Sequence, residues 1–238
     1  MSWAGLTVLA VVPARGGSKG IPGKNLQPLG GVSLVARALG LARQLPWIDH
    51  LALSTDSRGI AEEGRRSGVE VPALRPAELA TDTARSVDVW KHAWLGAEEE
   101  SGQRFDLSLL LQPTSPLRTA EDLERTVSAL VAGRHLTAAT VSRTPGHFTP
   151  EKTLTVGDGG VLHSYLPAGR AQSIRQLIPT YYHLNGYCYA ARRRAIVEAG
   201  TLLEEDCAAV EIRRPVVNVD EPFDLELAAW MLTRGEGR

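Results

Sequence analysis

The sequence predicts an α/β fold built on a mostly parallel sheet. Short apolar runs rich in β-branched residues alternate along the chain with longer segments whose apolar residues recur at helical spacing. That alternation is typical of βαβ units, because parallel strands need long crossover connections. The 238 residues, 43% of them hydrophobic, suit one large domain spanning residues 1–238.

The individual elements follow from these patterns in chain order. Strands are predicted where short apolar runs end at proline, glycine or polar residues, and helices where apolar residues recur every three or four positions. The expected strands are residues 7–12, 50–56, 69–74, 107–112, 137–143, 185–193 and 210–220. The expected helices are residues 33–44, 57–67, 86–100, 122–132 and 221–233.

The middle of the chain interrupts this alternation. The stretch KTLTVGDGGVLHSYL, residues 152–166, contains two alternating runs around Gly-Asp-Gly-Gly, a combination typical of a β-hairpin. We therefore expect a β-rich insertion at about residues 145–185 within the single α/β domain.

Charge and cysteine content exclude several classes of protein. Lys and Arg number 26 against 27 Asp and Glu, so the chain lacks the positive excess typical of proteins that bind nucleic acids or membrane surfaces. Two cysteines provide neither a disulfide framework nor a metal-ligand spacing, which favours a reducing, cytoplasmic location. The apolar run at residues 6–12 is too short to span a bilayer.

The loop after the first predicted strand, ARGGSKGIPGKN at residues 14–25, is chemically unusual. It contains three cations and two neutral hydrogen-bond donors, namely Arg15, Lys19, Lys24, Ser18 and Asn25. The first acidic residue of the chain is Asp49, so no carboxylate nearby in sequence neutralises these cations. Glycines let backbone N–H groups approach an anion closely, and the combination predicts a polyphosphate site. The glycine spacing matches neither a Walker A loop nor the G-x-G-x-x-G fingerprint.

A second polar loop follows the strand predicted at residues 107–112. The stretch LQPTSPLR places Gln112, Thr114 and Ser115 beside two prolines that stiffen the backbone. Rigid presentation lowers the ordering cost of binding, so this loop suits a polyhydroxylated ligand, with a proline-rich turn and helix cap as the alternative. Ligands of open α/β sheets bind beyond the carboxyl ends of the strands, where both loops are expected to lie.

Two polar residues end the last predicted strand. Asn218 and Asp220 alternate with Val217 and Val219, and a period of two places them on one face. A phosphate-handling site needs a hard divalent cation, and Mg²⁺ takes one or two carboxylates together with phosphate oxygens and waters. Asp220 is therefore the candidate metal ligand, and capping of the last helix is the alternative role.

Taken in order, several segments resemble those of the acylneuraminate cytidylyltransferases, the CMP-sialic acid synthetases and their bacterial relatives. They are ARGGSKGIPGKN, STD, RPAELATDT, LQPTSPLR, RQLIP followed by NG, and VNVDEPFDLELA. The resemblance runs from about residue 7 to about residue 230. It implies a three-layer, Rossmann-like nucleotidyltransferase fold, a Mg²⁺ requirement and a homodimer in which the β-rich insertion is the dimerisation arm. The implied reaction joins CTP and an acidic nine-carbon sugar, a nonulosonic acid, to give the CMP-sugar and pyrophosphate.

The resemblance also implies roles for individual residues. The residues implied in catalysis are Arg15, Lys24 and Asp220, and those implied at the metal are Asp220 and Asn218. The residues implied in binding CTP are Ala14, Ser18, Lys19, Asn25, Arg75, Ala80 and Thr81. The residues implied in binding the acidic sugar are Gln112, Thr114, Ser115, Arg175, Gln176 and Asn185.

Two departures from the family pattern bear on these roles. Asn218 stands where the family usually has an aspartate, which predicts weaker Mg²⁺ binding or one metal ion rather than two. Tyr187 introduces a bulky side chain near the expected sugar site, which leaves the identity of the nonulosonic acid open. The alternatives are a 3-deoxy-manno-octulosonate cytidylyltransferase, a hexose nucleotidyltransferase, or a non-catalytic protein that binds sugar nucleotides. The six histidines show no pattern of a base with an orienting partner.

Overall fold

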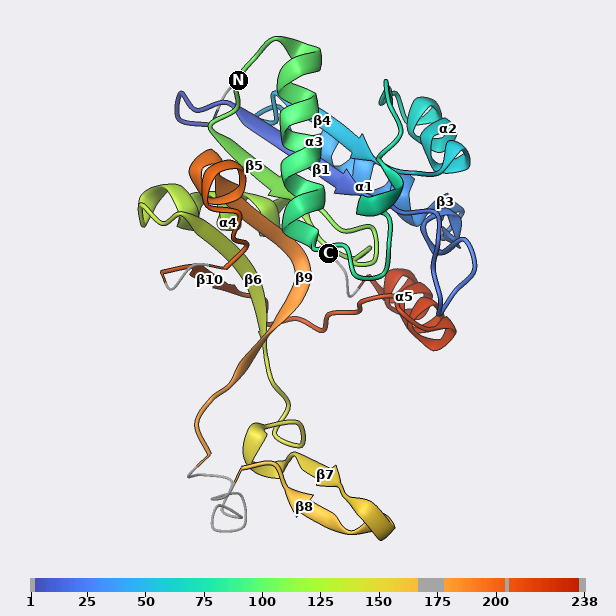
Figure 1. The fold of residues 1–238 in the computed structure, drawn as a ribbon, viewed down its shortest axis with the longest axis vertical. Helices are drawn as coiled ribbons and strands as arrows, with labels where there is room; N and C mark the ends of the chain where they lie inside the picture. The colour runs from blue at the N-terminus through green and yellow to red at the C-terminus, as the bar shows by residue number, and fades with distance from the viewer. Residues whose placement is uncertain (1–2, 167–177, 204–205, 236–238) are drawn as a thin grey trace.

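A computed structural model describes residues 3–166, 178–203 and 206–235 of the chain (Figure 1). Arg175 and Gln176, expected to bind the sugar, lie outside these residues. The main helices are α1 (Leu34–Arg43), α2 (Arg58–Arg66), α3 (Ser86–Ser101), α4 (Ala120–Ala132) and α5 (Pro222–Arg234). The strands of the central sheet are β1 (Val8–Pro13), β4 (His50–Ser54), β5 (Leu107–Leu110), β6 (Thr137–Arg143), β9 (Tyr182–Arg192) and β10 (Ala208–Glu211).

The central sheet confirms the prediction of a mostly parallel α/β fold. Its six strands lie in the order β10-β6-β9-β5-β1-β4. Strand β1 pairs in parallel with both β4 and β5, and β6 pairs in parallel with β10. Strand β9 is antiparallel to both of its neighbours, β5 and β6. The carboxyl ends of β1, β4 and β5 therefore meet at one edge of the sheet, where a ligand site is expected.

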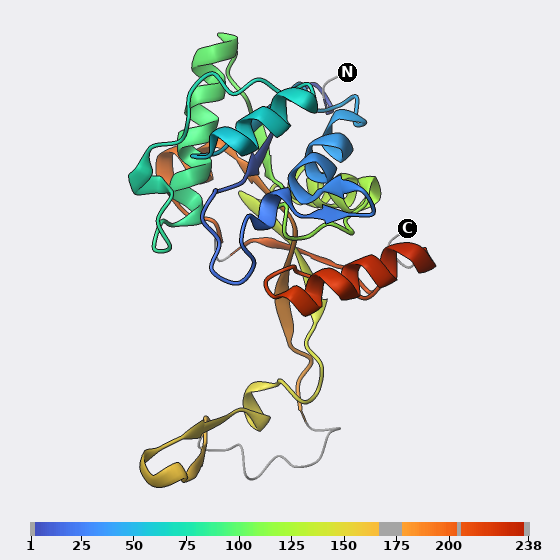
Figure 2. The same cartoon turned by 90° about the vertical axis from the view of Figure 1, so that its right-hand side faces the viewer.

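Helices cover both faces of the sheet, which gives the expected three layers (Figure 2). The alternation of β1 shows how: Val8, Ala10 and Val12 pack in one buried cluster with residues of α1 and α4. Leu9 and Val11 point to the opposite face and pack with residues of α3 and of the helical turn η6 (Arg194–Ala199). Because successive side chains of a strand point to opposite faces, a strand buried on both faces is apolar throughout.

Two of the predicted strands are wrong in whole or in part. Residues 69–74 form no strand, although Val69 and Val71 are buried in the cluster beneath α1 and α2. Residues 210–220 pair with the sheet only as far as Glu211, although Val217 and Val219 are buried against α5. Alternating burial therefore produces the pattern of a strand in segments that have no ladder partner.

The β-rich insertion is a protruding arm. Strands β6 and β9 continue beyond the sheet, and the antiparallel hairpin β7 (Leu154–Val156) and β8 (Leu162–Ser164) lies at the far end (Figure 1). The predicted hairpin is thus confirmed. The arm exposes a set of large apolar side chains: Phe148, Leu154, Val156, Val161, Leu162, Tyr165 and Tyr182. Within the described residues, no helix has the length and apolar character needed to cross a membrane.

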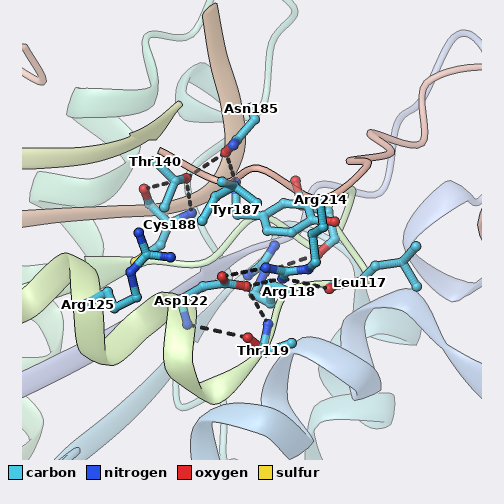
Figure 3. Close-up of polar contacts among 12 residues, drawn as sticks. Leu117, Arg118, Thr119, Asp122, Arg125, Thr140, Asn185, Tyr187, Cys188 and Arg214 are labelled. Atoms are coloured by element: carbon cyan, nitrogen blue, oxygen red, sulfur yellow. Dashed lines mark hydrogen bonds and ion pairs between the residues drawn. The ribbon is translucent and has the colours of Figure 1, made fainter. Parts of the chain in front are cut away.

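A buried ion pair fixes the start of α4 (Figure 3). The Asp122 side chain, only 1% exposed, accepts hydrogen bonds from the Arg214 guanidinium and from the backbone N–H of Thr119, the latter at 2.7 Å. The Thr119 hydroxyl accepts in return from the backbone N–H of Asp122, which completes a capping box. Arg214 also lies over the ring of Tyr187, 5.3 Å from its centroid. One carboxylate thereby joins α4 to the segment that leads to residues 218–220.

Asp122→Asn is expected to lower the free energy of unfolding by about 3 kcal/mol, because Arg214 loses its counter-charge while an oxygen remains to cap α4. Equilibrium urea denaturation measures the change. The matched control is Glu62→Gln on α2, whose exposed ion pair with Arg65 contributes at most about 0.5 kcal/mol. A loss no larger than that of the control would show that the buried pair contributes little.

Candidate functional site

A cavity of about 370 Å³ opens at the carboxyl ends of β1 and β5. Its wall combines the loop after β1, residues 75–89, the turn after β5 and the segment before α5. Ten of the residues singled out from the sequence line it: Arg15, Ser18, Lys24, Asn25, Arg75, Thr81, Gln112, Thr114, Asn218 and Asp220. The prediction that Asn218 and Asp220 face the same way is confirmed, although neither belongs to a strand.

The loop after β1 contacts the far end of the chain. Lys24 Nζ lies 2.9 Å from Asp220 Oδ1, and the Lys24 side chain is largely buried. A methyl group at Gly20 would lie only 2.2 Å from the carbonyl oxygen of Asp220. The backbones therefore approach so closely at this point that only glycine fits.

Acidic residues from distant loops neutralise part of this positive loop. Asp82 lies 2.7 Å from Arg15 Nη1 and 2.6 Å from Lys19 Nζ, and hydrogen bonds from these two cations lower its pKa. The backbone N–H of Gly16 donates to Asp56 Oδ1 at 2.9 Å. The sequence has no carboxylate near this loop, which predicts a loop that no acid neutralises. That prediction is wrong, because in the folded chain Asp56, Asp82 and Asp220 approach the loop from distant segments.

Arg75 presents a buried guanidinium to the cavity. Its side chain is 4% exposed, and Nη2 lies 3.6 Å from the Asp56 carboxylate. Burial lowers the pKa of Arg75, and the neighbouring Arg15 adds to the effect. Its Nε atom has no hydrogen-bond partner among the described residues. A buried donor without a partner, on the wall of a cavity, is suited to bind a polar ligand.

The turn after β5 is held from behind by Arg118. This buried arginine donates from Nε to the carbonyl of Ser115 at 3.0 Å and from Nη2 to the carbonyl of Gln112. The Ser115 hydroxyl donates to Asn218 Oδ1 at 2.6 Å, so it orients Asn218 rather than facing the cavity itself. The backbone N–H of Val219 donates to the carbonyl of Thr114 at 2.7 Å. The turn and the segment at residues 218–220 thus form one connected wall.

Gly186 of β9 lies beneath this wall. A methyl group there would come within 2.9 Å of the Ser115 hydroxyl and 3.2 Å of both Asn218 Oδ1 and Gln112 Oε1. Its φ of +73° also favours glycine. Three of the polar side chains predicted at the site therefore converge on one glycine.

Known proteins resemble the chain in sequence and in fold. A family model described as cytidylyltransferase matches residues 9–146. The CMP-N,N'-diacetyllegionaminic acid synthase of Legionella pneumophila is 31% identical, covering 96% of this chain and 95% of that protein.

The chain belongs to the cytidylyltransferase family.

One further relative resembles this cytidylyltransferase in sequence, and one solved structure resembles it in fold. The N-acylneuraminate cytidylyltransferase of Escherichia coli is 27% identical, covering 93% of this chain and 51% of that protein. The solved structure of CMP:2-keto-3-deoxy-manno-octonic acid synthetase complexed with CTP is 18% identical, covers 96% of this chain and 99% of that one, and superimposes with a TM-score of 0.71. The predicted resemblance to the acylneuraminate cytidylyltransferases and the predicted fold are therefore confirmed.

Several predicted site residues of the cytidylyltransferase do not line the cavity. Ala14 is fully buried, Lys19 extends outward toward Asp82, and Ala80 is absent from the cavity wall. The side chain of Asn185 is 1% exposed and bonds instead to β6, accepting from the Thr140 hydroxyl at 2.6 Å and donating to the Ser142 hydroxyl at 3.0 Å. In the structure it fastens β9 to β6 and does not line the cavity.

Tyr187, which was expected near the sugar site, does not line the cavity. Its side chain is fully buried in the cluster beneath α5, and burial raises its pKa to about 12. The pairing of β9 with β6 shifts register between Ala139 and Val141, so side chains near Gly186 do not alternate regularly, and the Tyr187 ring packs under Arg214. The bulk of Tyr187 therefore gives no information about the sugar.

The cavity also has lining residues that sequence reasoning did not single out. The most important is Asp82, which lies within RPAELATDT and could have been noticed as the only acid in the second half of that motif. The others are Pro13, Gly17, Leu79, Ala84, Ser86, Val89, Leu110 and Pro113. Small and apolar residues of this kind carry no chemical signal in a sequence.

Gly20→Ala is expected to lower the free energy of unfolding by about 1–3 kcal/mol, because the added methyl group forces the loop away from the Asp220 carbonyl. The same shift should weaken binding of CTP, measured by calorimetry. Gly17→Ala is the matched control in the same loop, since no atom lies within 4 Å of its added methyl group, and its stability should change by less than about 0.5 kcal/mol. Equal stability of the two variants would contradict the close approach.

Proposed function

We propose that the protein joins CTP to a nonulosonic acid and releases pyrophosphate. The observation that carries the proposal is one cavity that combines the cations of the first loop with the neutral donors of the Gln112–Ser115 turn. A triphosphate needs the former, and a polyhydroxylated sugar suits the latter. The relatives named for acylneuraminate and diacetyllegionaminic acid support a nonulosonic acid as the acceptor.

The proposed reaction is an in-line displacement. The anomeric hydroxyl of the sugar attacks the α-phosphorus of CTP and loses its proton to solvent water, a P–O bond forms, and the bond to pyrophosphate breaks. Arg15 and Lys24 neutralise charge on the phosphates, which is the main contribution expected in phosphoryl-type transfer. Binding of phosphates to Arg15 requires Asp82 to give up its ion pair. That exchange costs little because the pair is exposed to solvent.

The positions of the remaining lining residues indicate how each is proposed to bind the nucleotide. Ser18 and Asn25 line the cavity beside Arg15, where they can donate to phosphate oxygens. Arg75 and Thr81 lie on the same wall, and the unpartnered Nε of Arg75 is suited to a carbonyl oxygen of the cytosine.

The cavity wall formed by described residues contains no histidine, and its two carboxylates, Asp82 and Asp220, are both paired with cations. Positioning and charge neutralisation therefore account for the proposed catalysis.

The residues present fit a Mg²⁺ ion that the nucleotide helps to bind. Asp220 supplies one carboxylate and Asn218 one amide oxygen on the same wall. No group of three or more His, Cys, Asp or Glu able to hold a metal occurs in the described part of the chain. A Mg²⁺ ion here would depend on phosphate oxygens and waters for its other ligands, as Mg²⁺ commonly does. When bound, it would supply further positive charge at the phosphates.

The arm supports a homodimer. Its hairpin exposes contiguous apolar side chains on β7 and β8, among them Leu154, Val156 and Leu162, more than half of each exposed. Exposed apolar groups of this extent are typical of surfaces that contact another protein.

We also propose a cytoplasmic location, because Cys188 and Cys207 are both free thiols, as expected of a reducing compartment.

Release of pyrophosphate from CTP and Mg²⁺, measured across a panel of acidic sugars, tests the proposed function. Release is expected with N-acetylneuraminate, its deaminated form, legionaminate or pseudaminate, and not with hexose phosphates. The Lys24→Ala variant is the control, and its turnover should collapse because a cation at the phosphates is lost. Release only with 3-deoxy-manno-octulosonate would favour that alternative. Binding of CTP without release for any sugar would sink the enzymatic proposal.

Asn218→Asp is expected to lower the Mg²⁺ concentration for half-maximal rate about fivefold, the effect of roughly 1 kcal/mol from one added charge near the ion. The substitution keeps an oxygen that accepts from Ser115, so the wall of the cavity should stay in place. Titration of Mg²⁺ into the CTP complex by calorimetry provides a second measurement. No shift in either quantity would place residue 218 outside the reach of the metal.

A further inference from the structure

A second cavity, of about 300 Å³, lies between α1 and the back of the Gln112–Ser115 turn. It is separate from the cavity described above, and the two share no lining residue. The ten residues that line it include two arginines, Arg37 and Arg118, and no aspartate or glutamate. An arginine-rich cavity without an acid is unusual, because buried charges are normally paired.

Arg118 brings one unpartnered donor to this cavity. Two of its three nitrogens hold the carbonyls of Gln112 and Ser115, while Nη1 is buried without a hydrogen-bond partner among the described residues. Its side chain forms no ion pair with any described carboxylate, since the nearby Asp122 pairs with Arg214. Burial lowers the pKa of Arg118 to about 10, which reflects the cost of holding this charge away from water.

Arg37 of α1, which is half-buried, supplies a second cation with an unpartnered donor. Its Nη2 donates to the carbonyl of Leu29 at 2.5 Å, whereas its buried Nε has no partner in the part of the chain that the structure describes. No carboxylate of that part forms an ion pair with it, and burial lowers its pKa as well. Every cation placed in the first cavity by contrast has an acidic neighbour: Arg15, Lys24 and Arg75 face Asp82, Asp220 and Asp56.

We propose that this second cavity binds a small oxyanion of the phosphate class between Arg37 and Arg118. Two guanidiniums with unpartnered N–H groups match the acceptor oxygens and the charge of such an anion, which would satisfy both donors at once. Gln44 lies on the same wall and adds a neutral amide to the donor set. The anion would bind on the opposite side of Arg118 from the carbonyls of the sugar-side turn.

Thermal unfolding in increasing inorganic phosphate, at ionic strength held constant with sodium chloride, tests this site. A saturable rise in Tm is expected for the unmodified protein, and it should persist when CTP without metal fills the first cavity. Arg37→Gln should raise the half-saturating phosphate concentration about tenfold or more, because it removes a charge-assisted hydrogen bond. Arg37→Lys, which keeps the charge, should show a smaller shift.

Arg43→Gln is the matched control. Arg43 lies on the same helix and also donates to a backbone carbonyl, that of Ser67, but it does not line the second cavity. Its phosphate response should equal that of the unmodified protein. The proposal is overturned if the CTP-saturated protein shows no saturable response to phosphate, or if Arg37→Gln and Arg43→Gln respond alike. Because the first of these outcomes needs no variant, the test stands even if Arg37→Gln fails to fold.

Discussion

The contact between the loop after β1 and the segment at residue 220 is the constraint on which the rest of the site depends. Gly20 approaches the Asp220 carbonyl closely, and Lys24 pairs with the carboxylate of the same residue. Residues nearly two hundred positions apart are thereby fixed at one edge of the sheet. The Thr114 carbonyl then receives the N–H of Val219, which adds the turn after β5 to the same assembly. Without this closure the loop after β1 and the turn after β5 would have no common wall.

The two cavities handle positive charge in opposite ways. In the first, each buried or half-buried cation has an acidic neighbour that comes from another loop, as Arg75 has in Asp56. The Arg15–Asp82 pair is partly exposed and therefore weak, so the triphosphate proposed to bind there could replace Asp82 at low cost. In the second, Arg37 and Arg118 have no acidic partner among the described residues, and burial disfavours their charge. The cations of the first cavity therefore have acidic partners that a bound anion could replace. The arginines of the second cavity have no such partners among the described residues.

Much of the fold could be predicted from the sequence because apolar periodicity reports burial. It located five helices and the strands of the sheet, and it placed Asn218 and Asp220 on one side. It failed at residues 69–74, since alternating burial of Val69 and Val71 needs no paired neighbour. The loops of the cavity were recognisable by their chemistry. The approach of Asp82 to Arg15, and the burial of Tyr187, depend on tertiary packing and leave no trace in local sequence.

Strand β9 is one continuous element that runs from the arm to the core. It begins at Tyr182 in the stalk, passes Asn185 and Gly186 beneath the cavity wall, and ends at Arg192 between β5 and β6. The arm and the glycine that Gln112, Ser115 and Asn218 surround therefore belong to one strand, although its pairing with β6 shifts register beside that glycine. The hydrogen bonds of Asn185 to β6 fasten the two strands together next to Gly186. If a second copy docks on the arm, as proposed above, that contact and the wall of the cavity are joined by a single strand.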